Sequence, residues 1–151
     1  MEMSVTELYF AFGSNMLTAR VRDRCPSATP AGIALLHGHT LRFHKRSKDG
    51  SGKANALRTG NQFDLVRGVL FELTTADLTA LDRHEKGYER LELSVVRQDG
   101  ADVKAWIYVA SPDAIDDQLK PTADYLQLVV DGAKEHGLPA EYVKAIEEIG
   151  R

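Results

Sequence analysis

The pattern of hydrophobic and polar positions changes along this chain, from short apolar runs typical of strands to the wider spacing typical of helices. Near the start, residues 8–12 form an apolar and aromatic run that ends at Gly13, which predicts a buried strand. Residues 16–24 then place apolar side chains at roughly helical spacing. The opening of the chain is therefore predicted to be a strand, a tight turn and a helix.

Strands dominate the predicted structure in the middle of the chain. Short apolar runs place them at residues 33–36, 40–44, 54–57, 66–73, 91–96 and 103–109. The last two flank Asp99-Gly100, a dipeptide that favours a hairpin turn. Residues 45–53 are rich in Lys, Gly and Ser, and this composition predicts an exposed loop.

A short helix is predicted between the strands at 66–73 and 91–96. Thr74 and Asp77 match the capping signal in which a Ser or Thr is followed three residues later by an acidic side chain. Apolar side chains then continue at helical spacing, and Gly87 is the expected C-terminal cap. This helix is therefore expected to carry two carboxylates, Asp82 and Glu85.

The last third of the chain predicts two helices, at 122–136 and 140–149. Gly137-Leu138-Pro139 separates them, since Gly ends one helix and Pro begins the next. The order of elements mixes a parallel crossover with hairpins, which predicts an α+β fold with a curled mixed sheet. Residues 1–151 contain no internal repeat or linker and are expected to form one domain. The pattern leaves open whether the sheet closes into a barrel.

Composition and charge narrow the classes of partner. Of the 151 residues 43% are hydrophobic, enough for one core, and the net charge of -3 favours small-molecule partners over nucleic acid or anionic lipid. The single cysteine, Cys25, cannot form an internal disulfide. No stretch approaches the roughly 18 apolar residues of a membrane helix, and the start lacks a signal-peptide pattern. We therefore expect a cytoplasmic protein without a membrane anchor.

The turn Gly13-Ser14-Asn15 is the first candidate for a binding site. The free N–H groups and positive dipole end of a helix start can hold an anion such as a carboxylate or phosphate. Gly13 permits close approach of the backbone, Ser14 offers a hydroxyl, and Asn15 could cap the helix or donate its amide to a ligand. Taken alone, such a tripeptide is more often an ordinary turn, because it is neither a dinucleotide fingerprint nor a P-loop.

Glu85 is the second candidate, because its spacing to Leu78 and Leu81 puts it on the apolar face of the predicted helix. A carboxylate that faces inward in the last helical turn should have a raised pKa, from lost hydration and from the helix dipole. Such a group suits general acid–base catalysis near neutral pH. Periodicity does not separate it from Asp82, and a solvent-facing Glu85 paired with a neighbouring basic side chain stays open.

Other chemistry has weaker support. The five histidines show no metal-ligand spacing, so no metal site is expected, and a thiol nucleophile at Cys25 is equally weakly supported. The basic run from Arg42 to Arg58 has only Phe43 as an aromatic companion, which favours a solvated loop over a nucleic-acid surface. Three tyrosines could pack their rings while turning the hydroxyl to a cleft: Tyr88, Tyr108 and Tyr125.

Taken together, several segments resemble the γ-glutamylcyclotransferase-like family. The opening from Tyr9 to Met16, followed by Cys25-Pro26-Ser27-Ala28, is similar to the start of that family. Later segments follow in the order that the family shows, at 68–73, 81–85, 87–88 and 132–139. The resemblance covers nearly the whole chain, and the combination is far more specific than any one motif.

The resemblance implies a small mixed β-barrel with flanking helices. It also implies an enzyme that converts a γ-glutamyl amino acid, peptide or amine into 5-oxoproline and the free amine, without a cofactor. Glu85 matches the catalytic carboxylate of the family. The substrate-binding positions implied by the resemblance are Phe12, Gly13, Ser14, Asn15, Met16, Tyr88, Tyr108 and Tyr125. The oligomeric state, monomer or homodimer, is left open.

Two positions depart from the pattern of the family. Phe12 stands where the family often has Tyr, and Lys86 stands between Glu85 and Gly87. One alternative hypothesis keeps the fold and treats the protein as a non-catalytic sensor of small carboxylates. Another is nucleic-acid binding through the basic residues 42–58, against which the acidic charge balance argues.

Overall fold

The computed structural model describes residues 5–151, which form seven strands and four α-helices. The strands are β1 (Thr6–Ala11), β2 (Thr29–His37), β3 (His39–Arg46), β4 (Gly52–Arg58), β5 (Leu65–Thr74), β6 (Tyr88–Arg97) and β7 (Asp102–Ala110). The α-helices are α1 (Thr18–Arg24), α2 (Thr75–Asp82), α3 (Ala123–Glu135) and α4 (Ala140–Ile149). Two short 3-10 helices complete the order, η1 (Ser14–Met16) and η2 (Pro112–Ala114).

Five strands close into a barrel in the order β1-β5-β2-β6-β7. Neighbouring strands are antiparallel except where β1 meets β7, a parallel contact in which Tyr9 lies opposite Trp106. Closure gives each of these strands a neighbour on both sides, so none presents an open edge to solvent. The predicted α+β fold, the small mixed barrel with flanking helices and the β6–β7 hairpin are all confirmed.

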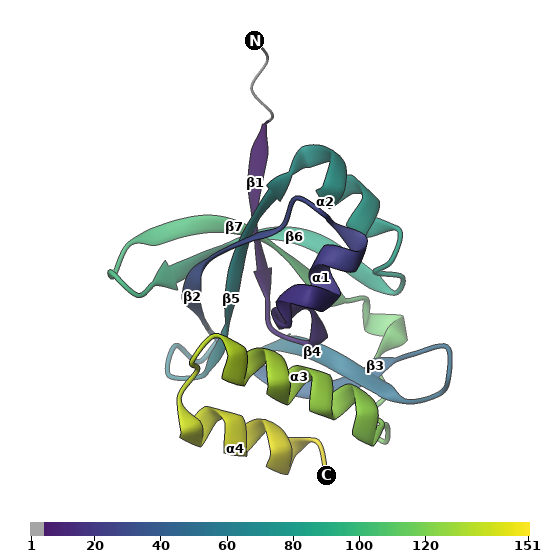
Figure 1. The fold of residues 1–151 in the computed structure, drawn as a ribbon. Coiled ribbons are helices and arrows are strands. Elements are labelled where there is room, and N and C mark those ends of the chain that lie inside the picture. Colours follow the sequence, from purple (N-terminus) through teal and green to yellow (C-terminus); the bar gives the residue numbers. More distant parts are fainter. Residues whose placement is uncertain (1–4) are drawn as a thin grey trace.

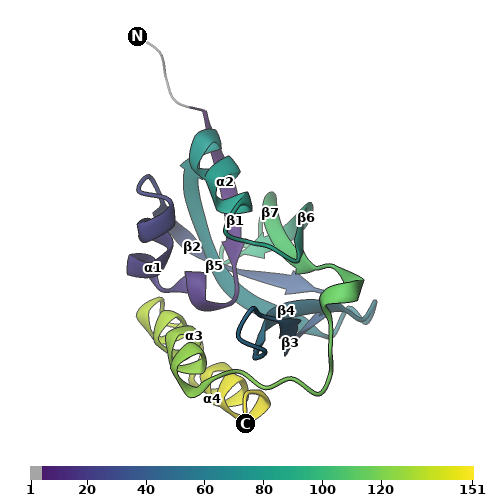
Figure 2. The same ribbon diagram turned by 90° about the vertical axis from the view of Figure 1, so that its right-hand side faces the viewer.

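The helices and the separate β3–β4 sheet surround this barrel. Figure 1 shows α3 and α4 side by side across one end of the barrel, next to the β3–β4 sheet. Figure 2 shows α1 and α2 along the flank near β1 and β5. The core draws fully buried side chains from most of these elements: Phe10, Met16, Val21, Leu70, Phe71, Leu78, Leu81, Ile107 and Ile146. Within residues 5–151 no helix is both long and apolar enough to cross a membrane.

Two glycines bring the backbone elements around η1 into direct contact. A Cβ on Gly68 of β5 would lie 2.4 Å from the carbonyl oxygen of Ala11, so β1 and β5 approach closely just before the turn. A Cβ on Gly132 of α3 would lie 2.6 Å from the amide nitrogen of Leu17. The missing side chains therefore let a strand and a helix hold the η1 turn from two directions.

The predicted helix over residues 16–24 is in fact two elements. Met16 belongs to the 3-10 helix η1, Leu17 is extended with φ -73° and ψ 114°, and α1 begins at Thr18. Met16 is fully buried, and its apolar side chain made the turn resemble the start of a helix. The helix dipole of α1 therefore does not begin at Gly13-Ser14-Asn15, and the prediction of an α-helix start at this turn is wrong.

The helix predicted to carry Glu85 ends earlier than expected. Thr74 accepts a hydrogen bond from the Asp77 N–H, as the capping signal predicts, but α2 stops at Asp82. The chain then turns tightly, with the Glu85 N–H donating to the Asp82 carbonyl at 3.3 Å. Gly87 does not cap the helix, and instead takes a φ of +83° in the turn before β6. Glu85 therefore lies in a loop, where helical periodicity no longer sets its direction.

The predicted exposed loop over residues 45–53 is shorter than expected. β3 extends to Arg46 and β4 begins at Gly52, so Lys45 and Lys53 are paired strand residues. Lys45 is buried, with 9% of its surface exposed. The Lys-, Gly- and Ser-rich composition identifies the turn correctly, but pairing between the two strands overrides the low strand propensity at its ends.

Replacing Gly132 by Ala should destabilise the protein, because the new Cβ would meet the Leu17 amide. Overpacking of this kind costs about 1–3 kcal/mol, against a gain in helix propensity of up to about 1 kcal/mol. Thermal unfolding measures the change, with Lys134→Ala, an exposed position on the same helix, as the control. Equal stability of the two variants would show that α3 does not rest directly on the turn.

Candidate active site

A cavity of about 50 Å³ lies beside η1, and we call it the inner cavity. It is lined by Tyr9, Phe10, Phe12, Gly13, Ser14, Asn15, Ala54, Glu85, Tyr88, Tyr108 and Tyr125. The structure thus brings together all of the site residues predicted from the sequence except Met16. Met16 is fully buried and supports the turn from the core without lining the cavity.

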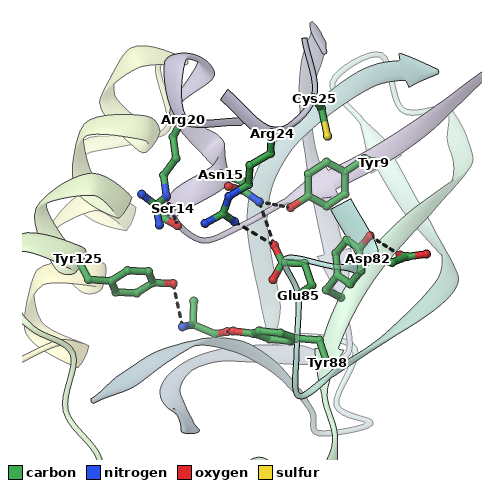
Figure 3. Close-up of polar contacts among 12 residues, drawn as sticks. Tyr9, Ser14, Asn15, Arg20, Arg24, Cys25, Asp82, Glu85, Tyr88 and Tyr125 are labelled. Carbon is green, nitrogen blue, oxygen red and sulfur yellow. Dashed lines mark hydrogen bonds and ion pairs between the residues drawn. The ribbon is translucent and has the colours of Figure 1, made fainter. Parts of the chain in front are cut away.

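Glu85 reaches the inner cavity from the loop after α2, with only 14% of its side chain exposed. Asn15 Nδ2 donates to Glu85 Oε1 at 3.1 Å, and a guanidinium nitrogen of Arg24 lies 3.7 Å from the same oxygen. Figure 3 shows both partners converging on this carboxylate. Burial raises the pKa of Glu85, while Arg24, Lys45 and the Asn15 hydrogen bond act in the opposite direction. The predicted raised pKa therefore follows from burial and not from a place in the last helical turn.

Asn15 connects Glu85 to the barrel. Its Nδ2 also donates to the hydroxyl of Tyr9 at 3.1 Å, and its side chain is buried. The Oδ1 atom of Asn15 is buried too and accepts no hydrogen bond from residues 5–151. Asn15 lies inside η1, so the predicted role as a helix cap is wrong. Its amide instead holds the carboxylate in place from the opposite wall of the cavity.

The backbone of the turn offers hydrogen-bond donors. Among residues 5–151 no acceptor bonds the N–H groups of Ser14 and Asn15. Arg20 Nε donates to Ser14 Oγ at 3.0 Å, so positive charge beside the turn comes from an arginine of α1 and not from a helix start. A Cβ on Gly13 would lie 3.1 Å from the Cβ of Ala54, so glycine is favoured here by close approach. These donors suit a carboxylate.

Tyr88 and Tyr125 form the wall that faces the turn (Figure 3). The Tyr88 hydroxyl donates to the Ala54 carbonyl at 2.7 Å, and the Ala54 N–H donates to the Tyr125 hydroxyl at 3.1 Å. Pairing between β3 and β4 is irregular between Arg42 and Lys45, opposite Ala54. The two tyrosines thus bond the N–H and the carbonyl of Ala54, a residue without a partner in the ladder, and they present their rings to the cavity.

Asp82 and Glu85, which periodicity did not separate, lie in different surroundings. The Tyr108 hydroxyl donates to Asp82 Oδ1 at 2.6 Å, and Arg90 bonds both oxygens of the same carboxylate, at 2.8 and 3.2 Å. Asp82 does not line the inner cavity. The geometry therefore selects Glu85 as the candidate acid–base group, and it leaves Tyr108 contributing its ring while its hydroxyl points away.

Cys25 lies near this site without the properties of a nucleophile. Burial raises the pKa of its thiol to about 11, and its Sγ donates to the carbonyl oxygen of Asp77 at 3.3 Å. The thiol is therefore protonated near neutral pH. In the described part of the chain, no group of three or more His, Cys, Asp or Glu side chains is arranged to hold a metal ion.

Comparison of the sequence with known proteins shows the family of this chain. A model of the AIG2-like family matches residues 65–146. The γ-glutamylcyclotransferase of Homo sapiens is 34% identical over 150 residues, which cover 93% of this chain and 78% of that protein. The γ-glutamylcyclotransferase of Bos taurus is 32% identical over 149 residues, 94% of this chain and 78% of that protein. The chain belongs to the γ-glutamylcyclotransferase family of enzymes.

A solved structure described as a γ-glutamyl cyclotransferase has the same fold. It aligns with a TM-score of 0.86 at 30% identity, over 95% of this chain and 87% of that one. The family resemblance seen in the sequence is therefore confirmed. The segment that matches the AIG2-like family model contains Glu85 and three of the four tyrosines that line the inner cavity, whereas Tyr9 and the turn at residues 12–16 precede it.

Sequence reasoning missed two polar residues that contact Asn15 or Glu85 in the candidate site. Tyr9 lies within the apolar run of β1 and reads as core, although its hydroxyl accepts from Asn15. Arg24 reads as a solvated charge, although it lies beside Glu85. The spacing of Arg20 and Arg24 could have indicated that Arg24 lies near the site. The two residues are four apart and so lie on one face of a helix that follows the turn.

Replacing Arg24 by Met should raise the pKa of Glu85 further, because Arg24 is the largest of the effects that oppose burial. An NMR titration of the Glu85 side-chain carboxyl carbon measures this change. Arg22→Met, at an exposed position on the same helix, is the matched control. An unchanged or lowered pKa in the Arg24 variant would contradict the arrangement described here.

Replacing Glu85 by Gln should stabilise the fold near neutral pH. The pKa of Glu85 is higher in the folded state than its ordinary value, so its ionisation costs stability above that value. The variant should therefore have the higher Tm near neutral pH, and the difference should shrink as the pH falls through the folded-state pKa and vanish below about 4.3, the ordinary value for Glu. Glu89→Gln, exposed on β6, is the control. A pH-independent difference would refute the effect.

Proposed function

We propose that this protein converts a γ-glutamyl amino acid, peptide or amine into 5-oxoproline and the free amine, with Glu85 as general acid and base. The observation that carries the proposal is a buried carboxylate of raised pKa, held at 3.1 Å by Asn15, in a cavity whose turn offers free N–H groups. The activity named for the relatives from Homo sapiens and Bos taurus supports it.

Binding is proposed to fold the glutamyl chain back on itself. The N–H groups of Ser14 and Asn15 would hold the α-carboxylate, and the rings of Tyr88, Tyr108 and Tyr125 would exclude water. In this pose the substrate's own α-amine lies beside its γ-carbonyl. Such intramolecular alignment supplies much of the rate, because the entropic cost of bringing two groups together is met on binding.

The chemistry then needs only proton transfers. Glu85 takes one proton from the α-ammonium, and the neutral amine attacks the γ-carbonyl carbon to form the new C–N bond. Protonated Glu85 donates this proton to the leaving nitrogen as the old C–N bond breaks. The ionised Glu85 then takes the second proton from the ring nitrogen and passes it to the released amine. Over the cycle the attacking nitrogen gives up two protons and the released amine gains two. We propose no cofactor, since only protons and an acyl group move.

A carboxylate sensor would share the cavity but not the turnover. It would bind γ-glutamyl compounds with a thermal shift that survives Glu85→Ala, and it would release no product.

The protonated, buried thiol of Cys25 is compatible with a reducing compartment, and we propose that the reaction takes place in the cytoplasm.

Incubation with a panel of γ-glutamyl amino acids, peptides and amines tests the proposal, with 5-oxoproline as the measured product. Glu85→Gln keeps the side-chain shape but cannot move the proton, and it should lower kcat by about 10²- to 10⁴-fold. Asp82→Asn, which removes the neighbouring carboxylate outside the cavity, is the matched control and should retain most of the activity. The proposal fails if no substrate gives product above the Glu85→Gln level.

A further inference from the structure

A second, larger cavity of about 420 Å³ adjoins the inner cavity, and we call it the outer cavity. The two cavities share Ser14, Glu85, Tyr88 and Tyr125 in their linings. A substrate whose glutamyl group occupies the inner cavity therefore directs the amine half of the molecule, which leaves in the reaction, into the outer one.

The outer cavity is strongly basic in a chain whose net charge is -3. Seven cationic side chains line it: Arg20, Arg24, Lys45, Lys48, Lys53, Arg83 and Lys86. Glu85 is the one carboxylate in the same lining, which also contains His84 and two tyrosines, Tyr88 and Tyr125. Figure 3 shows two of the cations, Arg20 and Arg24, extending from α1 toward the turn and Glu85.

Lys45 and Lys53 lie beside two of the residues that the cavities share. They lie directly opposite each other in the β3–β4 pair, an arrangement of like charges that disfavours the sheet. Their Nζ atoms lie over the rings of the two shared tyrosines, 4.6 Å from the centroid of Tyr88 and 4.0 Å from that of Tyr125. Both lysines are thus held at the mouth of the inner cavity.

These two ammonium groups have little compensation from the protein. No carboxylate of residues 5–151 lies within 4.0 Å of either one. Burial lowers the pKa of both. Glu85 acts in the opposite direction on Lys45, and Asp49 does so on Lys53, whose pKa is lowered further by Arg20 and Arg24. Two like charges that face each other, with no carboxylate of residues 5–151 in ion-pair contact, are suited to an anion brought by the ligand.

We propose that the outer cavity binds the negative charge of the leaving amine, so that the preferred substrates are γ-glutamyl derivatives of acidic amino acids or acidic peptides. This inference rests on the proposed function and names its substrate class. Lys45 and Lys53 contact the carboxylates of the amine half, and the arginines of α1 add to the positive potential around them. A neutral amine half leaves the two lysines uncompensated, and a cationic one is repelled.

A series of three substrates tests this inference: γ-glutamyl-aspartate, γ-glutamyl-alanine and γ-glutamyl-alaninamide. Their amine halves carry two, one and no carboxylates. The expected order of kcat/KM is aspartate, then alanine, then alaninamide, with about tenfold per carboxylate as the value for a charge-assisted contact. Added salt should reduce the differences in kcat/KM among the three substrates, because about 1 M ionic strength shortens the Debye length to about 3 Å.

The double variant Lys45→Met and Lys53→Met keeps the length of both side chains and removes their charge. It should abolish the order aspartate, alanine, alaninamide, whereas the loss of the Lys45 charge beside Glu85 should change kcat/KM for all three substrates by the same factor. Lys104→Met, an exposed lysine on β7, is the matched control and should keep the wild-type order. An equal loss for all three substrates that leaves their order unchanged would overturn the inference, because it would show that the lysines only shape the cavity.

The failure of this inference and that of the proposed function can be told apart. Turnover of all three substrates at similar rates would overturn the charge preference while the cyclotransferase activity stands. If none yields 5-oxoproline, the proposed function fails, and calorimetric titration with the same three compounds tests the outer cavity alone. Affinity that rises with each carboxylate and falls in the double variant would then support it, and equal affinities would overturn it.

Discussion

One side-chain amide ties together parts of the chain that are 70 residues apart. Asn15 Nδ2 donates to the carboxylate of Glu85 and to the hydroxyl of Tyr9, and it therefore links the η1 turn, the loop after α2 and the first strand of the barrel. Helical periodicity does not direct Glu85, since α2 ends at Asp82, and its carboxylate is instead oriented by this amide and by Arg24. The position of the proposed acid–base group thus depends on a residue in the turn that is proposed to hold the substrate.

The barrel makes that contact possible by bringing backbone close to backbone. At Gly68, β5 reaches the end of β1, and at Gly132, α3 reaches the residue that follows η1. Neither approach tolerates a Cβ without movement. The turn is held between these two elements, so its free N–H groups are preorganised before any ligand arrives, which lowers the cost of binding.

Sequence reasoning found most of the residues of the site but not their geometry. Glu85 was identified from helical spacing, although α2 ends before it, because Leu78 and Leu81 still direct the end of the helix inward. Closure of the barrel depends on the parallel contact between Tyr9 and Trp106, which no local pattern predicts. Charged residues such as Lys53 read as solvated, because a linear pattern does not show which distant side chain will lie beneath them.

Ala54 gives its N–H to Tyr125 and its carbonyl to the hydroxyl of Tyr88, so the aromatic wall of the inner cavity is also part of the hydrogen-bonding framework. Changing either tyrosine to Phe strands a buried peptide group at a cost of about 1–3 kcal/mol. A substitution that reshapes this wall therefore also lowers the stability of the fold. The lysines and arginines of the outer cavity make no hydrogen bond to Ala54. Substitutions among them can therefore change the substrate range without breaking the hydrogen bonds that hold this wall.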